Sequence, residues 1–130
     1  MSIKKSIAIV FAVIAFVTVF QIMTSGENAM LIDMSGTAIS FSGIDDFKHQ
    51  VAYTDMDSVT IEEVSDWSKW GGHEYGIFRI GHLEGYALFV TTQVDCVIII
   101  SLTDGTQMVF NYNNNSDTEE IYQMLLNNLQ

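Results

Sequence analysis

The hydrophobic and polar positions divide the chain into one continuous apolar segment and a longer remainder of short alternating runs. Residues 7–23 contain only two polar side chains. At the 1.5 Å rise of a helix they would extend about 26 Å, near the length needed to cross a hydrocarbon core of about 30 Å. The pattern therefore predicts one N-terminal transmembrane helix at residues 6–24, followed by a domain that folds without it.

The flanks of this segment indicate its orientation. Lys4 and Lys5 lie in a basic start at residues 1–5, which the positive-inside rule leaves in the cytoplasm. Thr24-Ser25-Gly26 offers small residues at a processing site, so a cleaved signal peptide is the alternative to a retained anchor. Both alternatives place the C-terminal domain outside the cytoplasm, and we expect a single-pass protein of the cytoplasmic membrane.

The first part of the remainder has the pattern of a β-hairpin. Residues 29–34 and 37–41 are short β-type runs on either side of Ser35-Gly36, which favours a tight turn. We expect residues 25–34 to serve as linker and first strand, and residues 35–130 to form the domain.

The middle of the chain combines one alternating run with a glycine-rich stretch. Residues 58–64 alternate, with β-branched side chains directed inward. Residues 67–85 contain five glycines, which predicts a loop region interrupted by one brief strand at residues 77–80.

The C-terminal third shows the strongest β signals. Residues 86–92 and 96–102 are predicted strands, and the second is almost continuously apolar, as expected for a strand central to the core. Asp104-Gly105 then predicts a hairpin turn into residues 106–112. Cys96 begins the second of these strands, where we expect a buried thiol that acts as a small hydrophobic side chain.

A helix is predicted at the C-terminus. Ser116 and Glu119 have the spacing of a capping box, in which each side chain bonds the backbone N–H of the other residue. An apolar stripe at helical spacing follows, so this helix should lie against the sheet. The stripe comprises Ile121, Tyr122, Leu125 and Leu129, widened by Met124 and Leu126.

Strands without intervening helices that end in one amphipathic helix describe a curved antiparallel sheet or small barrel with a helical plug. The order of elements over residues 35–129 resembles the bacterial pleckstrin-homology-like (PH-like) domains. The resemblance rests on residues 51–59, Tyr75-Gly76-Ile77-Phe78, residues 85–90, Val97-Ile98-Ile99-Ile100, Asp104-Gly105, Val109-Phe110-Asn111 and residues 118–122.

The resemblance implies a mainly β protein, with a PH-like antiparallel β-barrel or sandwich capped by a C-terminal α-helix. It implies no shared catalytic residues, and its activities would be binding of a protein or peptide or of a lipid head group. The chain departs from the lipid-binding pattern because the predicted first hairpin, residues 29–41, contains no lysine or arginine.

Charge narrows the choice of ligand. The chain has a net charge of −11, and all 16 acidic residues lie from Glu27 onward, where only Lys48, Lys69 and Arg79 are basic. Nucleic acids and anionic lipid surfaces both require basic clusters, so neither is expected as a partner.

No set of residues indicates catalysis, and we expect no cofactor and no metal. His73, Glu74, His82 and Glu84 lie close in sequence, but their spacing fits no helix-borne metal motif. A metal-dependent enzyme built on this segment is the least favoured alternative. Three acidic pairs match no calcium-binding loop, which favours a solvated charged face: Asp45-Asp46, Asp55 with Asp57, and Glu62-Glu63.

Aromatic residues are the one feature that indicates recognition. Trp67, Trp70, Tyr75 and Phe78 lie within twelve residues, and aromatic side chains supply large contact areas at low entropic cost. The alternative is that they cover an open end of the sheet or rest at the lipid interface. We therefore expect a non-enzymatic, membrane-anchored interaction module with a possible partner site at these four residues.

Overall fold

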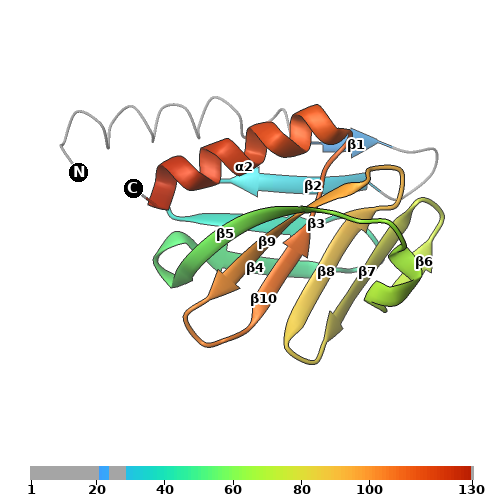
Figure 1. Cartoon of the computed structure of the whole chain (residues 1–130), viewed down its shortest axis with the longest axis horizontal. Helices are drawn as coiled ribbons and strands as arrows, with labels where there is room; N and C mark the ends of the chain where they lie inside the picture. The colour runs from blue at the N-terminus through green and yellow to red at the C-terminus, as the bar shows by residue number, and fades with distance from the viewer. Residues whose placement is uncertain (1–20, 24–28, 130) are drawn as a thin grey trace.

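The computed structural model describes residues 21–23 and 29–129, which form two β-sheets and a C-terminal helix (Figure 1). The four-stranded sheet contains, in spatial order, β1 (Gln21–Met23), β2 (Ala29–Met34), β3 (Ala38–Ser42) and β4 (Lys48–Ala52). The six-stranded sheet contains β5 (Met56–Glu63), β6 (His73–Tyr75), β7 (Phe78–Leu83), β8 (Tyr86–Thr91), β9 (Cys96–Leu102) and β10 (Gln107–Phe110). Two 3₁₀ helices, η1 (Tyr53–Asp55) and η2 (Trp67–Trp70), and the helix α2 (Asn115–Leu129) complete the fold.

The mainly β character and the C-terminal helix predicted from the sequence are confirmed. The turn at Ser35-Gly36 joins β2 to β3, and Asp104-Gly105 joins β9 to β10. Gly105 has a φ of 89°, a left-handed conformation that glycine adopts without a steric penalty. In β9, Ile98 and Ile100 face the main core while Val97 and Ile99 face the cluster under Trp67 and Trp70, so both faces are covered, which explains its continuous run of apolar residues.

The expectation of a wholly antiparallel sheet is wrong at one pair of strands. The six-stranded sheet has the order β5-β9-β10-β8-β7-β6, and β10 pairs parallel to β8 while it pairs antiparallel to β9. β10 therefore inserts between two strands that precede it in the chain. Alternating hydrophobicity shows which face of a strand is buried but not which strand lies beside it, so the sequence predicted neighbours in chain order.

Asn111 fills the space where β10 ends between β8 and β9. Its side-chain oxygen accepts a hydrogen bond from the Thr91 N–H at 2.7 Å. Its side-chain nitrogen donates to the carbonyl oxygens of Thr91 at 3.0 Å and Cys96 at 3.1 Å. Asn111 is fully buried, so one carboxamide continues the hydrogen bonding between the two strands beyond the last residue of β10.

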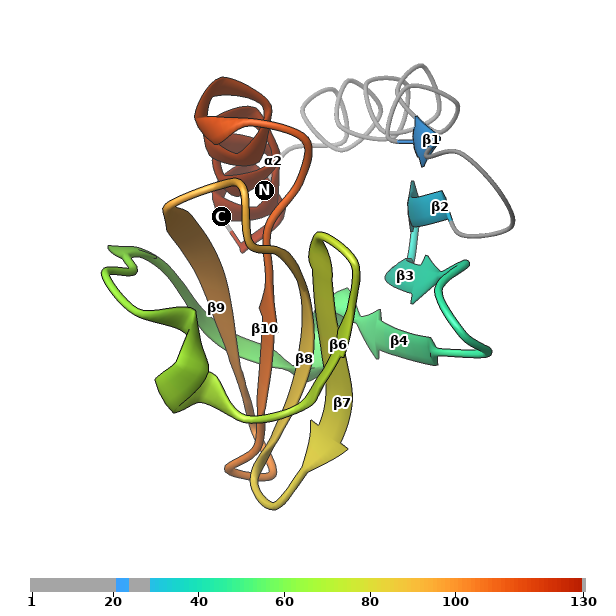
Figure 2. The same cartoon turned by 90° about the vertical axis from the view of Figure 1, so that its right-hand side faces the viewer.

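The main core lies between the two sheets and is closed by α2, which packs against β5 and β9 (Figure 2). Phe41 of the four-stranded sheet contacts Phe110 and Phe89 of the other sheet, with ring centroids 4.7 Å and 5.8 Å apart. Ile121 and Leu125 of α2 are fully buried against this cluster. Both sheets are open and their inner faces form one core, so the arrangement is two sheets rather than a closed barrel.

The helix begins earlier than the sequence predicted. The side-chain oxygen of Asn114 accepts from the Asp117 N–H at 2.7 Å, so Asn114 caps α2 and the expected capping box of Ser116 and Glu119 is wrong. The Thr118 hydroxyl is fully buried, and it accepts from the Tyr112 N–H at 2.9 Å. This bond ties the first turn of α2 to the segment that follows β10.

The segment from residue 67 to residue 85 is more regular than predicted. It contains η2 and two strands, β6 and β7, which pair antiparallel across Gly76-Ile77. The glycines here occupy turns and close approaches between neighbouring segments, so they do not prevent strand formation. The predicted brief strand at residues 77–80 corresponds to the first half of β7.

The predicted transmembrane segment falls almost entirely outside the described residues. Three residues near its end, Gln21–Met23, form β1 and pair with β2. Within residues 21–23 and 29–129, no helix has both the length and the apolar character required to cross a membrane. Met30, Ile32 and Met34 are buried in the main core, so the segment expected to be linker and first strand contributes to the folded unit.

Candidate functional site

The four aromatic residues expected to form a partner site do not lie on one surface. Trp67 and Trp70 lie side by side on η2, with ring centroids 5.9 Å apart, and they pack on the outer face of the six-stranded sheet. Phe78 is buried in the main core on the inner face of that sheet. Tyr75 also packs against the main core, and its hydroxyl donates to the carboxylate of Asp45. Only the tryptophan pair forms one continuous aromatic surface.

The tryptophan pair covers an apolar face. Under it lie buried side chains of β8, β9 and β10, namely Leu88, Val90, Val97, Ile99 and Val109. The Tyr86 hydroxyl donates to the Trp70 carbonyl, and Asp66 accepts from the Ser68 N–H at 3.0 Å, so the η2 backbone is held at both ends. The tryptophans thus shield one face of the sheet, whereas the alternative expected from the sequence was that they cover an open end of it.

Gly71 and Gly72 allow η2 to approach the sheet closely. Both have positive φ, 75° and 78°. A Cβ atom on Gly72 would lie 2.7 Å from the Ile80 carbonyl oxygen, and one on Gly71 would lie 2.7 Å from the Leu83 side chain. No larger residue fits at either position without a shift of the backbone or of Leu83. The packing therefore fixes the tryptophan segment in place.

A second group of side chains gathers where the β3–β4 turn meets β7. The Phe47 ring stacks on His82, with centroids 4.6 Å apart, and His49 lies 5.4 Å from His82 between ring centroids. His49 comes from β4 and His82 from β7, so the two sheets meet here. Burial and the neighbouring His82 lower the pKa of His49 below its ordinary value, which favours the neutral imidazole at pH 7.

Three shallow depressions surround this group. One lies over β3 and β4 and includes Lys48 and His49, and one lies between His49, His82 and the two turns at the end of the six-stranded sheet. The third contains His82, His73 and the β3–β4 turn, in which Asp45 and Asp46 have positive φ. All three histidines of the chain thus border one end of the two-sheet core.

The carboxylates of Glu74 and Glu84, which are near His73 and His82 in sequence, do not line these three depressions. Glu74 forms an ion pair with Arg79 at 2.6 Å, and Glu84 is exposed in the turn between β7 and β8. Within residues 21–23 and 29–129, no group of three or more histidine, cysteine or acidic side chains is arranged to hold a metal ion. The six residues of the acidic pairs, Asp45, Asp46, Asp55, Asp57, Glu62 and Glu63, are all exposed.

The backbone of β4 presents an open edge. The Tyr53 N–H donates to the Thr37 carbonyl at 3.0 Å, in register with the pairing of β3 and β4. Hydrogen-bonded and non-hydrogen-bonded positions alternate along an antiparallel ladder, so the residues at 49 and 51 also point their backbone groups toward β3. The backbone groups of Lys48, Gln50 and Ala52 therefore point away from β3, and no described strand pairs with that side.

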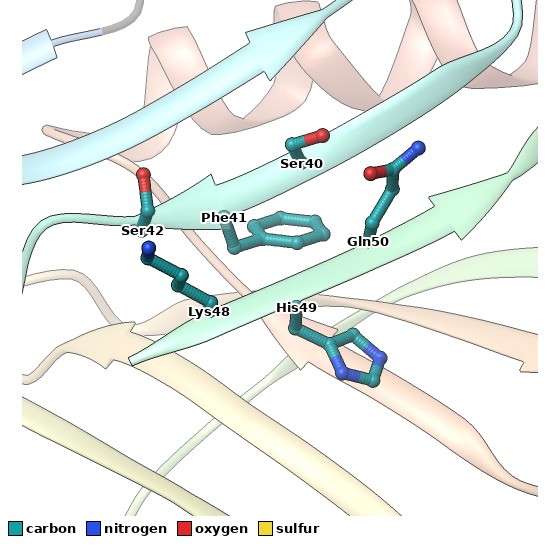
Figure 3. A pocket seen from close by; sticks show the side chains of 6 residues that line it. All are labelled: Ser40, Phe41, Ser42, Lys48, His49 and Gln50. Carbon is teal, nitrogen blue, oxygen red and sulfur yellow. The ribbon is translucent and has the colours of Figure 1, made fainter. Parts of the chain in front are cut away.

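Polar side chains accompany this edge on the outer face of the sheet (Figure 3). Ser42 lies opposite Lys48 and Ser40 lies opposite Gln50 in the pairing of β3 with β4. Lys48 and Gln50 are exposed, and the depression that these four side chains line has a volume of about 370 Å³. Ammonium, carboxamide and hydroxyl groups can all donate hydrogen bonds, so this face can bind an acceptor such as a carboxylate.

Cys96 differs from the buried thiol that the sequence predicts. It is partly exposed, and its sulfur donates to the Asn115 side-chain oxygen at 3.4 Å. Desolvation and the nearby Asp95 and Glu119 raise its pKa, which keeps the thiol protonated at neutral pH and limits its nucleophilicity.

No local pattern in the sequence indicates that the β4 edge and its neighbour His82 are parts of one surface. Lys48 and His49 follow an unremarkable turn, and His82 is 33 positions further along the chain than His49. Only the crossing of the two sheets brings them together. Comparison of the chain with protein-family models, with curated proteins and with solved structures gives no match.

Proposed function

We propose that this chain is a non-enzymatic interaction module with a PH-like fold, anchored in the cytoplasmic membrane by residues 6–24, and that its extracytoplasmic domain binds a protein or peptide. The open edge of β4 carries this proposal. An extended segment of a partner can add to such an edge, since main-chain hydrogen bonds supply affinity and side chains beside the edge supply specificity.

Several features support the PH-like fold within this proposal. Two β-sheets enclose one core, a short 3₁₀ turn leads from β4 into β5, and the C-terminal helix closes the core. The parallel pairing of β8 with β10 is a departure from the wholly antiparallel arrangement that the resemblance implies.

A lipid head-group binder is the alternative that the resemblance also implies, but charge opposes it. Lys48 is the only lysine or arginine in the four-stranded sheet as described, and the chain carries a net charge of −11. Anionic membranes attract basic clusters and repel acidic surfaces. Strong, salt-sensitive sedimentation with anionic vesicles would reverse this preference.

Photo-crosslinking in cells tests the proposal directly. A photoreactive amino acid at Gln50 of the full-length protein should give a discrete covalent adduct, because Gln50 is exposed on the open edge. The matched control places the same group at Gln123, which is exposed on α2. Absence of an adduct from position 50, or the same adducts from both positions, would contradict a binding site at this edge.

The tryptophan surface provides a separate test. Trp67→Ala with Trp70→Ala should lower stability by about 2–4 kcal/mol, since truncation of large apolar side chains uncovers the sheet face beneath them. The adduct from position 50 should persist in this variant under conditions where it remains folded. Loss of that adduct with unchanged stability would move the partner site to the tryptophan pair.

A further inference from the structure

The β4 edge differs in charge from the rest of this acidic chain. The two depressions that flank β4 contain Lys48, His49 and His82, and no carboxylate lines either of them. The chain as a whole has 16 acidic residues and five lysines and arginines. Asp45 and Asp46 line the third depression, where Asp45 accepts a hydrogen bond from Tyr75. Asp33 of β2 is exposed opposite Ser40, two strands away from Gln50 on the outer face, so Lys48 is the one positive charge among these carboxylates in the four-stranded sheet as described.

The geometry of the edge sets the form of the occupant. Lys48, Gln50 and Ala52 direct their backbone groups outward, so a segment of about five residues in extended conformation can continue the sheet. Alternate side chains of an added strand point to opposite faces. Those on the outer face would lie beside Lys48 and Gln50, and those on the inner face would lie toward His49 and His82.

We propose that β4 is the docking strand for an extended acidic peptide segment of a partner protein, with its glutamate or aspartate side chains placed beside Lys48. This inference rests on the proposed function and specifies its partner. Lys48 makes no salt bridge within the described residues, so it can pair with a carboxylate of the peptide without loss of an existing ion pair.

Charge favours an acidic peptide over a second copy of the chain as the partner of β4. Pairing of β4 with β4 of another copy would bring two strongly acidic domains together, and their mutual repulsion opposes association. It would also bring two Lys48-bearing edges into contact without supplying a carboxylate from either strand, because β4 contains none. An acidic segment of a different protein supplies the carboxylate that β4 lacks, and its few charges meet less repulsion from this chain than a second whole domain does.

A binding experiment with defined peptides tests the proposal on the full-length chain in nonionic detergent. The probe is a labelled nine-residue peptide that alternates glutamate with valine, and the control peptide has glutamine at every glutamate position. Fluorescence anisotropy should show binding of the acidic peptide about two- to fivefold tighter than that of the neutral peptide, as one ion pair to an exposed lysine provides. Equal affinities would overturn the acidic occupant.

Two pairs of variants locate the contact. Lys48→Glu should weaken binding of the acidic peptide at least about tenfold, whereas Lys69→Glu, an exposed lysine on η2, should leave it within about twofold. Gln50→Pro removes an outward-pointing N–H and should abolish binding, while Gln50→Ala keeps that N–H and should retain it. If the proline variant does not fold, the lysine pair still decides the question.

The outcomes distinguish this inference from the function on which it rests. Equal binding of both peptides, with a persistent cellular adduct at position 50, would leave an interaction module whose partner is not selected by acidic side chains. Loss of that adduct would overturn the interaction site itself. Self-association that light scattering detects and that Gln50→Pro abolishes would assign the edge to a second copy and overturn the peptide.

Discussion

Replacement of Asn111 with aspartate tests whether the insertion of β10 between β8 and β9 depends on one buried carboxamide. The substitution preserves the side chain's shape and its acceptor oxygen, which still faces the Thr91 N–H. It replaces the donor nitrogen with an oxygen that faces the carbonyl oxygens of Thr91 and Cys96. Two hydrogen bonds are lost, and three oxygen atoms meet in a site with no exposure to water.

The expected loss follows from these contacts. Each lost hydrogen bond contributes about 1 kcal/mol net, and each buried carbonyl left without a donor adds a desolvation cost of about 1–3 kcal/mol. At neutral pH the new carboxyl group must either remain ionised beside two carbonyl oxygens or bind a proton, which costs about 1.4 kcal/mol for each unit by which its pKa rises. We expect Asn111→Asp to lower the free energy of unfolding by about 4 kcal/mol or more at pH 7.

The pH dependence supplies the sharper signature. Burial raises the pKa of this aspartate in the folded chain above the unfolded value of about 3.9, so the folded state binds the proton more tightly between the two values. Stability relative to the original chain should therefore fall as pH rises through this interval and recover in part as pH falls toward 4. A protonated carboxyl group can donate one hydrogen bond, so recovery should be incomplete.

Urea unfolding followed by tryptophan fluorescence at pH 7 and pH 4.5 measures both effects, with the original chain as reference at each pH. Asn127→Asp is the matched control because Asn127 is exposed on α2, and it should change stability by less than about 0.5 kcal/mol. If the free energy of unfolding of Asn111→Asp lies within about 1 kcal/mol of that of the original chain at pH 7, or varies with pH in the same way, the role assigned to this carboxamide is refuted.

Three further predictions concern other parts of the fold. Thr118→Val removes a buried hydroxyl that accepts a hydrogen bond from the Tyr112 N–H, so it should lower the free energy of unfolding in urea by about 1–3 kcal/mol. Thr118→Ser keeps the hydroxyl and should retain most of that stability. Gly72→Ala should lower the free energy of unfolding by about 2–3 kcal/mol and Gly76→Ala by about 1 kcal/mol. Both glycines have positive φ, but only a Cβ atom at position 72 would meet a carbonyl oxygen, at 2.7 Å. Equal losses would show that the close contact is unimportant. The pKa of His49 is lowered in the folded chain, so the unfolded state binds its proton more tightly and the free energy of unfolding should fall as pH drops below about 6.5. His49→Gln should reduce the change in unfolding free energy between pH 7.5 and 5.5. An unchanged pH dependence in this variant would contradict the prediction.

The local elements of this protein could be predicted from short stretches of sequence. Asp104-Gly105 between two apolar runs specifies a hairpin because few other residues adopt the required turn at low cost. The run from Cys96 to Leu102 indicates a strand covered on both faces, and the burial of Ile98 and Ile100 on one face and of Val97 and Ile99 on the other confirms it. The apolar stripe that includes Ile121 and Leu125 likewise predicted which side of α2 is buried.

Positions decided by competition between local signals were predicted less well. Asn114 and Ser116 are both good helix caps, and the structure uses Asn114 because α2 already begins at residue 115, with Thr118 bonded to the preceding segment. The glycines after Trp70 suggested a loop, yet the close approach of η2 to β7 requires glycine beside regular strands. In both places a tertiary contact selected between conformations that are locally acceptable.

The sequence by itself determined which residues are apolar enough to be buried and where the chain must turn. Tertiary structure alone decided that β10 lies parallel to β8, that Asn111 fills the space beyond it, and that Lys48, His49 and His82 border one edge. The physical reason is that period-two alternation and turn residues act over a few positions. Pairing between distant strands instead depends on how the whole chain closes its core, and no short stretch of sequence records that arrangement.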